Sequence, residues 1–80
     1  MDRITLIRDA AVRKGLAASA LPVNVKRLAR VCGISRQTMH RAFRPTARLS
    51  WRTLERLSEN LDIPFELLVA TQARSGAEIQ

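Results

Sequence analysis

The clearest absence in this 80-residue sequence is that of acidic side chains from its middle. No Asp or Glu lies between Asp9 and Glu55, whereas the same stretch holds ten Lys and Arg residues, and the whole chain carries a formal net charge of +7. A basic middle between acidic ends predicts one positive face directed at a polyanion. The alternative, an ordinary solvated surface of a basic protein, gives no reason for the acid-free stretch to coincide with the central helical motif.

Cysteines and long apolar runs are also scarce. A single cysteine excludes an internal disulfide and is typical of a protein in a reducing cytoplasm. No apolar run approaches the roughly 18–20 residues that a membrane helix needs, and the charged start of the chain does not resemble a signal peptide. With 46% hydrophobic residues the chain is expected to form one globular domain over residues 1–80, in the cytoplasm and associated with the nucleoid.

The chain lacks the clusters of residues on which metal binding and catalysis usually depend. His40 is the only histidine, and no CxxC pair or carboxylate cluster accompanies it, so we expect no metal, no cofactor and no small-molecule ligand. Cys32 lies on an apolar stripe and is expected to point into the core, away from His40, which makes a Cys-His nucleophile improbable. These absences predict that the protein is not an enzyme.

Helical periodicity, with no strand-like alternation and no repeats, predicts an all-α domain of five helices. The first is expected from Asp2 to about Ser19, with Ile4, Ile7, Ala11 and Ala18 along its buried stripe. Gly15 leaves open an alternative in which the helix ends at Lys14 and a short second turn follows. The later helices are expected at about 24–32, 36–43 and 50–61 and from Pro64 onward, with a frayed tail at 74–80.

The segment from Asn24 to Arg44 predicts two short helices joined by a tight turn at Gly33. Asn24 and Ser35 are suitable N-caps, and glycine adopts the left-handed conformation that ends many helices. The apolar positions of the two helices are Leu28, Ala29, Cys32, Met39, Ala42 and Phe43. The opposite face of the second helix is polar throughout, with arginine, glutamine and histidine side chains that suit nucleic acid. RNA is the weaker candidate, because proteins that bind single-stranded RNA stack its bases on aromatic side chains, and these two helices have few of them.

This segment resembles the helix-turn-helix of the lambda-repressor-like (Cro/repressor) family. Ala29 stands four residues before Gly33, Ile34 follows it directly, and Met39 stands six residues after it, as in the family's motif. Residues 50–68, SWRTLERLSENLDIPFELL, are similar to the family's fourth and fifth helices, so the resemblance covers about residues 24–70. Asp62 departs from the pattern, because the family often has glycine there.

The resemblance implies a compact five-helix domain that binds double-stranded DNA in the major groove. Arginine can contact guanine and glutamine can contact adenine through two hydrogen bonds each. The candidate base contacts are Arg36, Gln37, Thr38, His40 and Arg41. The candidate phosphate contacts are Asn24, Lys26, Arg44, Thr46 and Arg48. Trp51 is expected at the core or its edge.

The resemblance implies a transcriptional regulator, specifically a dimeric repressor that occupies a promoter. Small proteins of this family commonly occur in phages or mobile elements and repress the promoter of their own operon. A homodimer on an inverted repeat doubles a readout of only a few base pairs. Four apolar residues in five near the last helix suggest an interface in which Phe65, Leu68 and Val69 take part. Two alternatives stay open. Instead of forming an interface, all four apolar residues close the core; instead of a regulator, the chain is a protein-interaction module such as an antitoxin, with DNA binding secondary.

Overall fold

Five helices make up this protein in a computed structural model that describes residues 2–17 and 23–79, and the backbone alone for residues 73–79. They are α1 (Arg3–Arg13), α2 (Val25–Cys32), α3 (Arg36–Ala42), α4 (Trp51–Leu61) and α5 (Phe65–Ile79). The described residues contain no strand, which confirms the prediction of a compact, all-helical chain. Within those residues, none of the helices has the length and hydrophobicity needed to cross a lipid bilayer.

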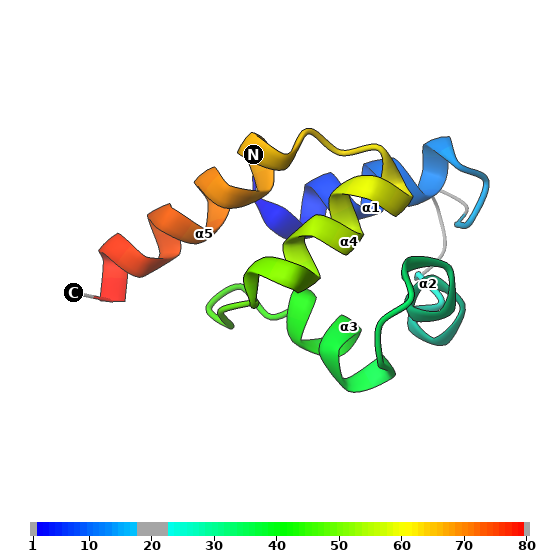
Figure 1. Ribbon diagram of the computed structural model, residues 1–80, viewed down its shortest axis with the longest axis horizontal. Coiled ribbons are helices and arrows are strands. Elements are labelled where there is room, and N and C mark those ends of the chain that lie inside the picture. Colours follow the sequence, from blue (N-terminus) through cyan, green and yellow to red (C-terminus); the bar gives the residue numbers. More distant parts are fainter. Residues whose placement is uncertain (1, 18–22, 80) are drawn as a thin grey trace.

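The central element is α4, which packs against α1, α2 and α5. In Figure 1, α2 and α3 lie together below α1 and α4, whereas α5 extends away from them to the left. The core between the helices is formed by side chains with almost no exposed area. The largest of them are Ile7, Leu28, Met39, Leu54, Leu57, Leu61 and Leu68.

Each of the first four helices begins at a side-chain cap. The cap residue stands just before the helix, and its side-chain oxygen accepts a hydrogen bond from the backbone N–H three residues later, which would otherwise have no partner. The pairs are Asp2 with Thr5 (2.7 Å), Asn24 with Arg27 (3.1 Å), Ser35 with Thr38 (3.1 Å) and Ser50 with Thr53 (3.2 Å). The predicted caps at Asn24, Ser35 and Ser50 are therefore confirmed.

Three of the helices are followed by a residue in the left-handed conformation: Gly15 (φ 71°), Gly33 (φ 70°) and Asp62 (φ 54°). In each case the N–H of the next residue returns to a carbonyl five positions earlier, at distances of 2.8, 3.0 and 3.2 Å. This pattern satisfies carbonyls at the end of the helix and turns the chain sharply. Asp62 adopts the geometry usual for glycine, and its carboxylate pairs with Lys14 at 2.5 Å.

The predicted first helix was too long. It ends at Arg13, not near Ser19, because Gly15 takes up the left-handed conformation that the alternative interpretation requires. Ile7 and Ala11 are buried as predicted, Ile4 is half-buried, and Ala18 and the connector around Pro22 lie outside the described residues. At the other end, α5 is longer than the predicted short helix, and fraying of residues 74–80 stays a prediction.

Replacing Gly33 by alanine should destabilise the fold more than replacing Gly15. Both positions have positive φ, so each variant should lose about 1–2 kcal/mol of unfolding free energy. A Cβ at Gly33 would also come within 2.9 Å of the Arg56 guanidinium, whereas a Cβ at Gly15 meets nothing within 4 Å. Displacing Arg56 breaks a hydrogen bond worth about 0.5–1.5 kcal/mol. Urea denaturation measures both variants, and an equal loss at the two glycines would contradict this account of the turn.

Candidate nucleic-acid interface

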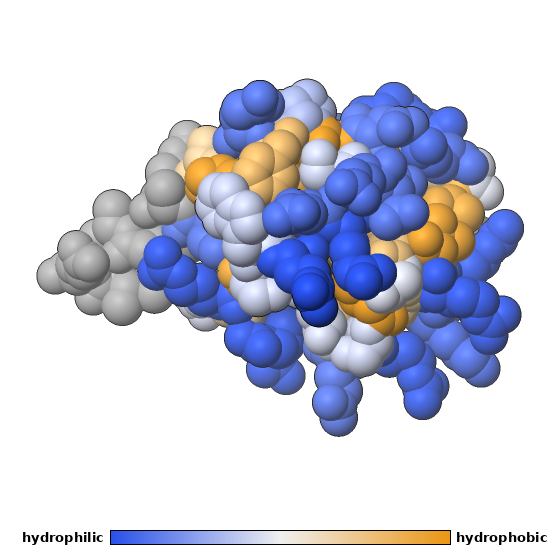
Figure 2. Space-filling view, viewed as in Figure 1, coloured by the Kyte–Doolittle hydropathy of each residue, from blue (hydrophilic) through white to orange (hydrophobic). Residues whose placement is uncertain are grey.

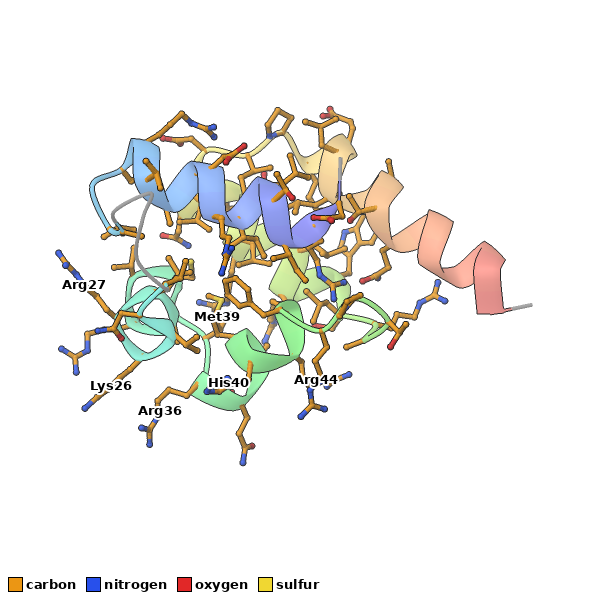
Figure 3. The ribbon with its side chains drawn as sticks, turned by 180° about the vertical axis from the view of Figure 1, so that it is seen from behind. Lys26, Arg27, Arg36, Met39, His40 and Arg44 are labelled. Carbon is orange, nitrogen blue, oxygen red and sulfur yellow. The ribbon has the colours of Figure 1, made fainter. Side chains whose placement is uncertain are left out.

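Helix α3 has one buried face and one fully polar face. Met39 and Ala42 have no exposed area, and they anchor the helix on the core. Arg36, Gln37 and His40 project from the other face into solvent. Figure 3 shows Met39 pointing into the molecule while Arg36 and His40 point away from it. The helix therefore presents polar side chains from a fixed position.

Basic side chains from neighbouring elements continue this polar face. We call the row formed by Lys26, Arg27, Arg36, His40 and Arg44 the basic edge. Figure 3 shows Lys26 and Arg27 of α2 on one side of α3 and Arg44 on the other. In Figure 2 separate hydrophilic side chains project along the same edge of the molecule. Residues 24–48 contain seven Lys and Arg residues and no Asp or Glu, so no carboxylate within this segment offsets the positive charge.

The turn between α2 and α3 is held by two side chains of α4. Arg56 donates from Nη1 to the Gly33 carbonyl at 3.2 Å, and Asn60 Nδ2 lies 3.4 Å from the Cys32 carbonyl. Asn60 is itself positioned by donating to the Arg56 carbonyl at 2.8 Å. These donors supply partners to carbonyls at the end of α2, which a helix terminus leaves unsatisfied. The relative orientation of α2 and α3 thus depends on α4.

Arg3, the first residue of α1, fixes the far end of α3. Its Nε donates to the Ala42 carbonyl at 2.9 Å, and its Nη2 donates to the Arg44 carbonyl at 2.6 Å and lies 3.4 Å from that of Arg41. The side chain is only 5% exposed, and among the described residues it has no carboxylate partner. Burial, and then the nearby charge of Arg41, lower the pKa of its guanidinium. A cation at a helix C-terminus is favoured by the helix dipole.

Arg3 is not among the site residues predicted from the sequence, although its position in the helical pattern pointed to a buried charge. Arg3, Ile7 and Ala10 follow the i, i+4, i+7 spacing of one helix face, and all three are buried. A charged residue on an otherwise apolar stripe is expected to find buried hydrogen-bond partners. The spacing gives no indication of which partners these are, because they lie about forty residues further along the chain.

The loop after α3 is held from two directions. Arg41 donates from Nη2 to the Arg48 carbonyl at 2.8 Å. Gln72 of α5 makes two hydrogen bonds with the backbone of the buried Leu49, donating to its carbonyl and accepting from its N–H, both at 2.8 Å. The loop that carries Thr46 and Arg48 is therefore tied to α3 and to α5.

The predicted base contacts differ in how free they are. The side chains of Arg36, Gln37 and His40 are exposed and make no hydrogen bond within the described structure, whereas the exposed side chain of Arg41 is bonded to the loop. Thr38 is half-buried, and its hydroxyl accepts from the Ser35 hydroxyl at 2.8 Å as part of the cap. Arg36, Gln37 and His40 are thus the best placed for a ligand.

The predicted phosphate contacts Asn24, Lys26, Arg44, Thr46 and Arg48 are all exposed. The side-chain oxygen of Asn24 is already used in its cap. The Arg44 carbonyl accepts from Arg3, but its guanidinium projects into solvent (Figure 3). The charged members of this set therefore keep their cationic groups available.

The predicted interface residues need correction. Leu68 has no exposed area, because α5 packs this residue into the core, so it offers no surface to a partner. Phe65 and Val69 are half-buried against the core. The exposed apolar side chains of this region are instead Leu67 (47% exposed) and Trp51 (60% exposed). Trp51 lies at the edge of the core, with its ring 4.8 Å from that of Phe65 in an edge-to-face arrangement.

Cys32 and His40 occupy the environments that the sequence suggested. Cys32 is fully buried, and burial raises the pKa of its thiol to about 11, so the nucleophilic thiolate is disfavoured. His40 is exposed on α3. No group of three or more potential metal ligands comes together in the part of the chain that the structure describes.

Comparisons of this chain with known protein families, with curated proteins and with solved structures found no match. Its function must therefore be inferred from the geometry and charge of its own residues.

Substituting Arg3 by methionine should destabilise the protein by about 2–3 kcal/mol, because buried carbonyls at the end of α3 would lose their donor. Arg8→Met is the matched control, since Arg8 is exposed on the same helix. Its expected effect is within about 0.5 kcal/mol. Denaturant unfolding followed by circular dichroism compares the two. Equal stabilities for the Arg3 and Arg8 variants would show that α3 does not depend on this contact.

Proposed function

We propose that this chain is a sequence-specific DNA-binding regulator, in which α2, the Gly33 turn and α3 act as a helix-turn-helix of the lambda-repressor-like kind. One observation carries the proposal. The exposed face of α3 bears Arg36, Gln37 and His40, and the opposite face is anchored by Met39 and Ala42. A helix that is fixed on one side and bears hydrogen-bonding side chains on the other suits the major groove of B-DNA, which admits an α-helix.

In this proposal α3 enters the groove and its first turn reads base edges. The Arg36 guanidinium donates two hydrogen bonds to the N7 and O6 acceptors of guanine, and the Gln37 amide pairs with the N7 acceptor and the amino group of adenine. His40 lies one helical turn further on and contacts the next base step. Each such contact contributes about 1–3 kcal/mol of discrimination against a wrong base.

The rest of the basic edge binds the phosphate backbone. A major groove is bordered by two phosphate strands, and the basic edge has cations on both sides of α3: Lys26 and Arg27 on one, Arg44 on the other (Figure 3). Arg27 joins the phosphate set because of this position. Phosphate contacts fix the register of the protein without reading sequence. The Arg3 and Gln72 contacts support this function by holding α3 and the following loop in place.

The regulator acts as a repressor, because a protein bound across a promoter sterically excludes the polymerase. It does so as a homodimer on an inverted repeat, with half-sites about 10 base pairs apart or a multiple of that spacing. The exposed Leu67 supports this part of the proposal, since it leaves an apolar side chain of α5 in solvent. Two-fold symmetry places the same surface of both copies at the interface.

Selection of bound sites from random duplex DNA tests the proposal and supplies a cognate sequence. On that sequence Arg36→Ala and Gln37→Ala should each lose about 1–3 kcal/mol of binding free energy while affinity for random DNA changes little. Arg48→Ala should weaken binding to both kinds of DNA and reduce the salt slope by about one unit. Fluorescence anisotropy over a salt series measures these effects.

Arg8→Ala is the control for these variants, because it removes one positive charge from α1, away from the basic edge. Its affinity for both DNAs should stay near that of the wild type. If Arg36→Ala, Gln37→Ala and Arg48→Ala weaken cognate and random DNA alike, the division into base and phosphate contacts is wrong. If selection enriches no sequence, specific recognition itself is wrong.

Leu67→Glu should convert the homodimer to a monomer, because it places a charge in an interface that depends on apolar contact. Val12→Glu is the control, because Val12 is also an exposed apolar residue (40%) but belongs to α1, so this variant introduces the same charge outside α5. Sedimentation at tens of micromolar should show a dimer for the wild type and for Val12→Glu. A wild-type monomer that binds half-sites as tightly as full palindromes would contradict the dimer.

A further inference from the structure

An open hollow lies beside α4 and the first turn of α5, outside the basic edge. It has a volume of about 300 Å³ and is lined by Trp51, Glu55, Ser58, Glu59 and Phe65. Among the residues whose side chains are described, Trp51 is the most exposed large hydrophobic residue, and its edge-to-face contact with Phe65 gives the hollow an aromatic wall.

The hollow is also bordered by two carboxylates. Glu55 and Glu59 stand one turn apart on α4, and both are exposed. Like charges at this spacing repel and destabilise a helix. Among the described residues neither carboxylate has an ion pair, although the chain has twice as many basic as acidic residues. Asp62, by contrast, is paired with Lys14. Two carboxylates that face solvent beside an exposed tryptophan favour a cation from outside the chain.

We infer that this hollow is a docking site for an arginine side chain carried by an extended basic segment of a partner protein. A guanidinium stacks on the face of a tryptophan ring and donates paired hydrogen bonds to carboxylates. Trp51 with Glu55 and Glu59 supplies both kinds of partner. Lysine fits less well, because its ammonium is a compact charge without a planar face. The open shape of the hollow suits a side chain that is presented by a segment passing over the surface.

Charge distinguishes this partner from the two other candidates. Duplex DNA is a polyanion, so the two glutamates repel it. A second copy of this chain carries most of its basic side chains between residues 13 and 52, and those of the basic edge are proposed to bind DNA. Seating them in the hollow would remove them from DNA. A separate basic protein satisfies the hollow and leaves the basic edge free. The choice of this partner over a second copy rests on the proposed function, whereas the binding of arginine in the hollow does not.

Trp51 is the only tryptophan of the chain, so its fluorescence reports directly on the hollow. The full chain is titrated with a blocked pentapeptide that has one central arginine between glycine and serine residues, and with the same peptide in which neutral citrulline replaces arginine. We expect a saturable change in fluorescence with the arginine peptide and binding at least about fivefold weaker with the citrulline peptide, as cation–π and carboxylate contacts imply.

The double variant Glu55→Gln/Glu59→Gln should weaken binding of the arginine peptide about three- to tenfold. Asp9→Asn/Glu66→Gln is the control with the same change in net charge, and its side chains are exposed and outside the hollow. It should bind the peptide like the wild type. Both double variants should bind random duplex DNA with equal affinity, which separates this test from that of the proposed function.

Two results would overturn the inference: equal binding of the arginine and citrulline peptides, or equal weakening of binding in the two double variants. Sedimentation in the presence of the peptide completes the test. If the dimer dissociates as the peptide fills the hollow, the hollow is occupied by the second copy in the dimer, and this result would contradict a separate partner.

Discussion

Helix α3 has seven residues, and a helix of that length is not stable in water on its own, because isolated helices shorter than about 12–15 residues are marginal. Contacts from elsewhere in the fold therefore have to hold it. Its start is capped by Ser35, its inner face is anchored by Met39 and Ala42, and its last carbonyls accept hydrogen bonds from Arg3. This dependence explains why α1, which is distant in sequence, bears on the geometry of the basic edge.

Helix α4 combines three roles on its different faces. Its apolar face, with Leu54, Leu57 and Leu61, forms the centre of the core. Arg56 and Asn60 hold the turn that sets α3 against α2, and Glu55 and Glu59 line the hollow beside Trp51. A small domain thereby presents two surfaces of opposite charge, one proposed for DNA and the other for a basic protein segment. Both surfaces are positioned by the same helix, from different faces of it.

Features that depend on neighbours in sequence could be predicted from the chain. The caps at Asn24, Ser35 and Ser50 act over three residues, and Gly33 ends its helix through its own conformational freedom. Gly15 has the same freedom, but the cost of glycine within a helix, about 1 kcal/mol, is too small for sequence alone to decide where that helix ends.

Features that join distant residues could not be predicted. Arg3 bonds to carbonyls 39 and 41 residues away, and Gln72 bonds to Leu49 across 23 residues, so no local pattern indicates these partners. The apolar residues of α5 posed a different difficulty. Four apolar side chains in five positions leave the buried face of a helix undetermined. Packing of α5 against α1 and α4 leaves Leu68 buried and Leu67 exposed.

The central claim is that the basic edge is the surface that meets DNA. Mapping amide chemical shifts in a titration of the full chain with a selected duplex tests it most directly. The account predicts that the largest changes fall within residues 24–48, with small changes in α1 and in residues 66–72. Changes centred on α4 and α5 near the hollow, with residues 24–48 unaffected, would contradict it.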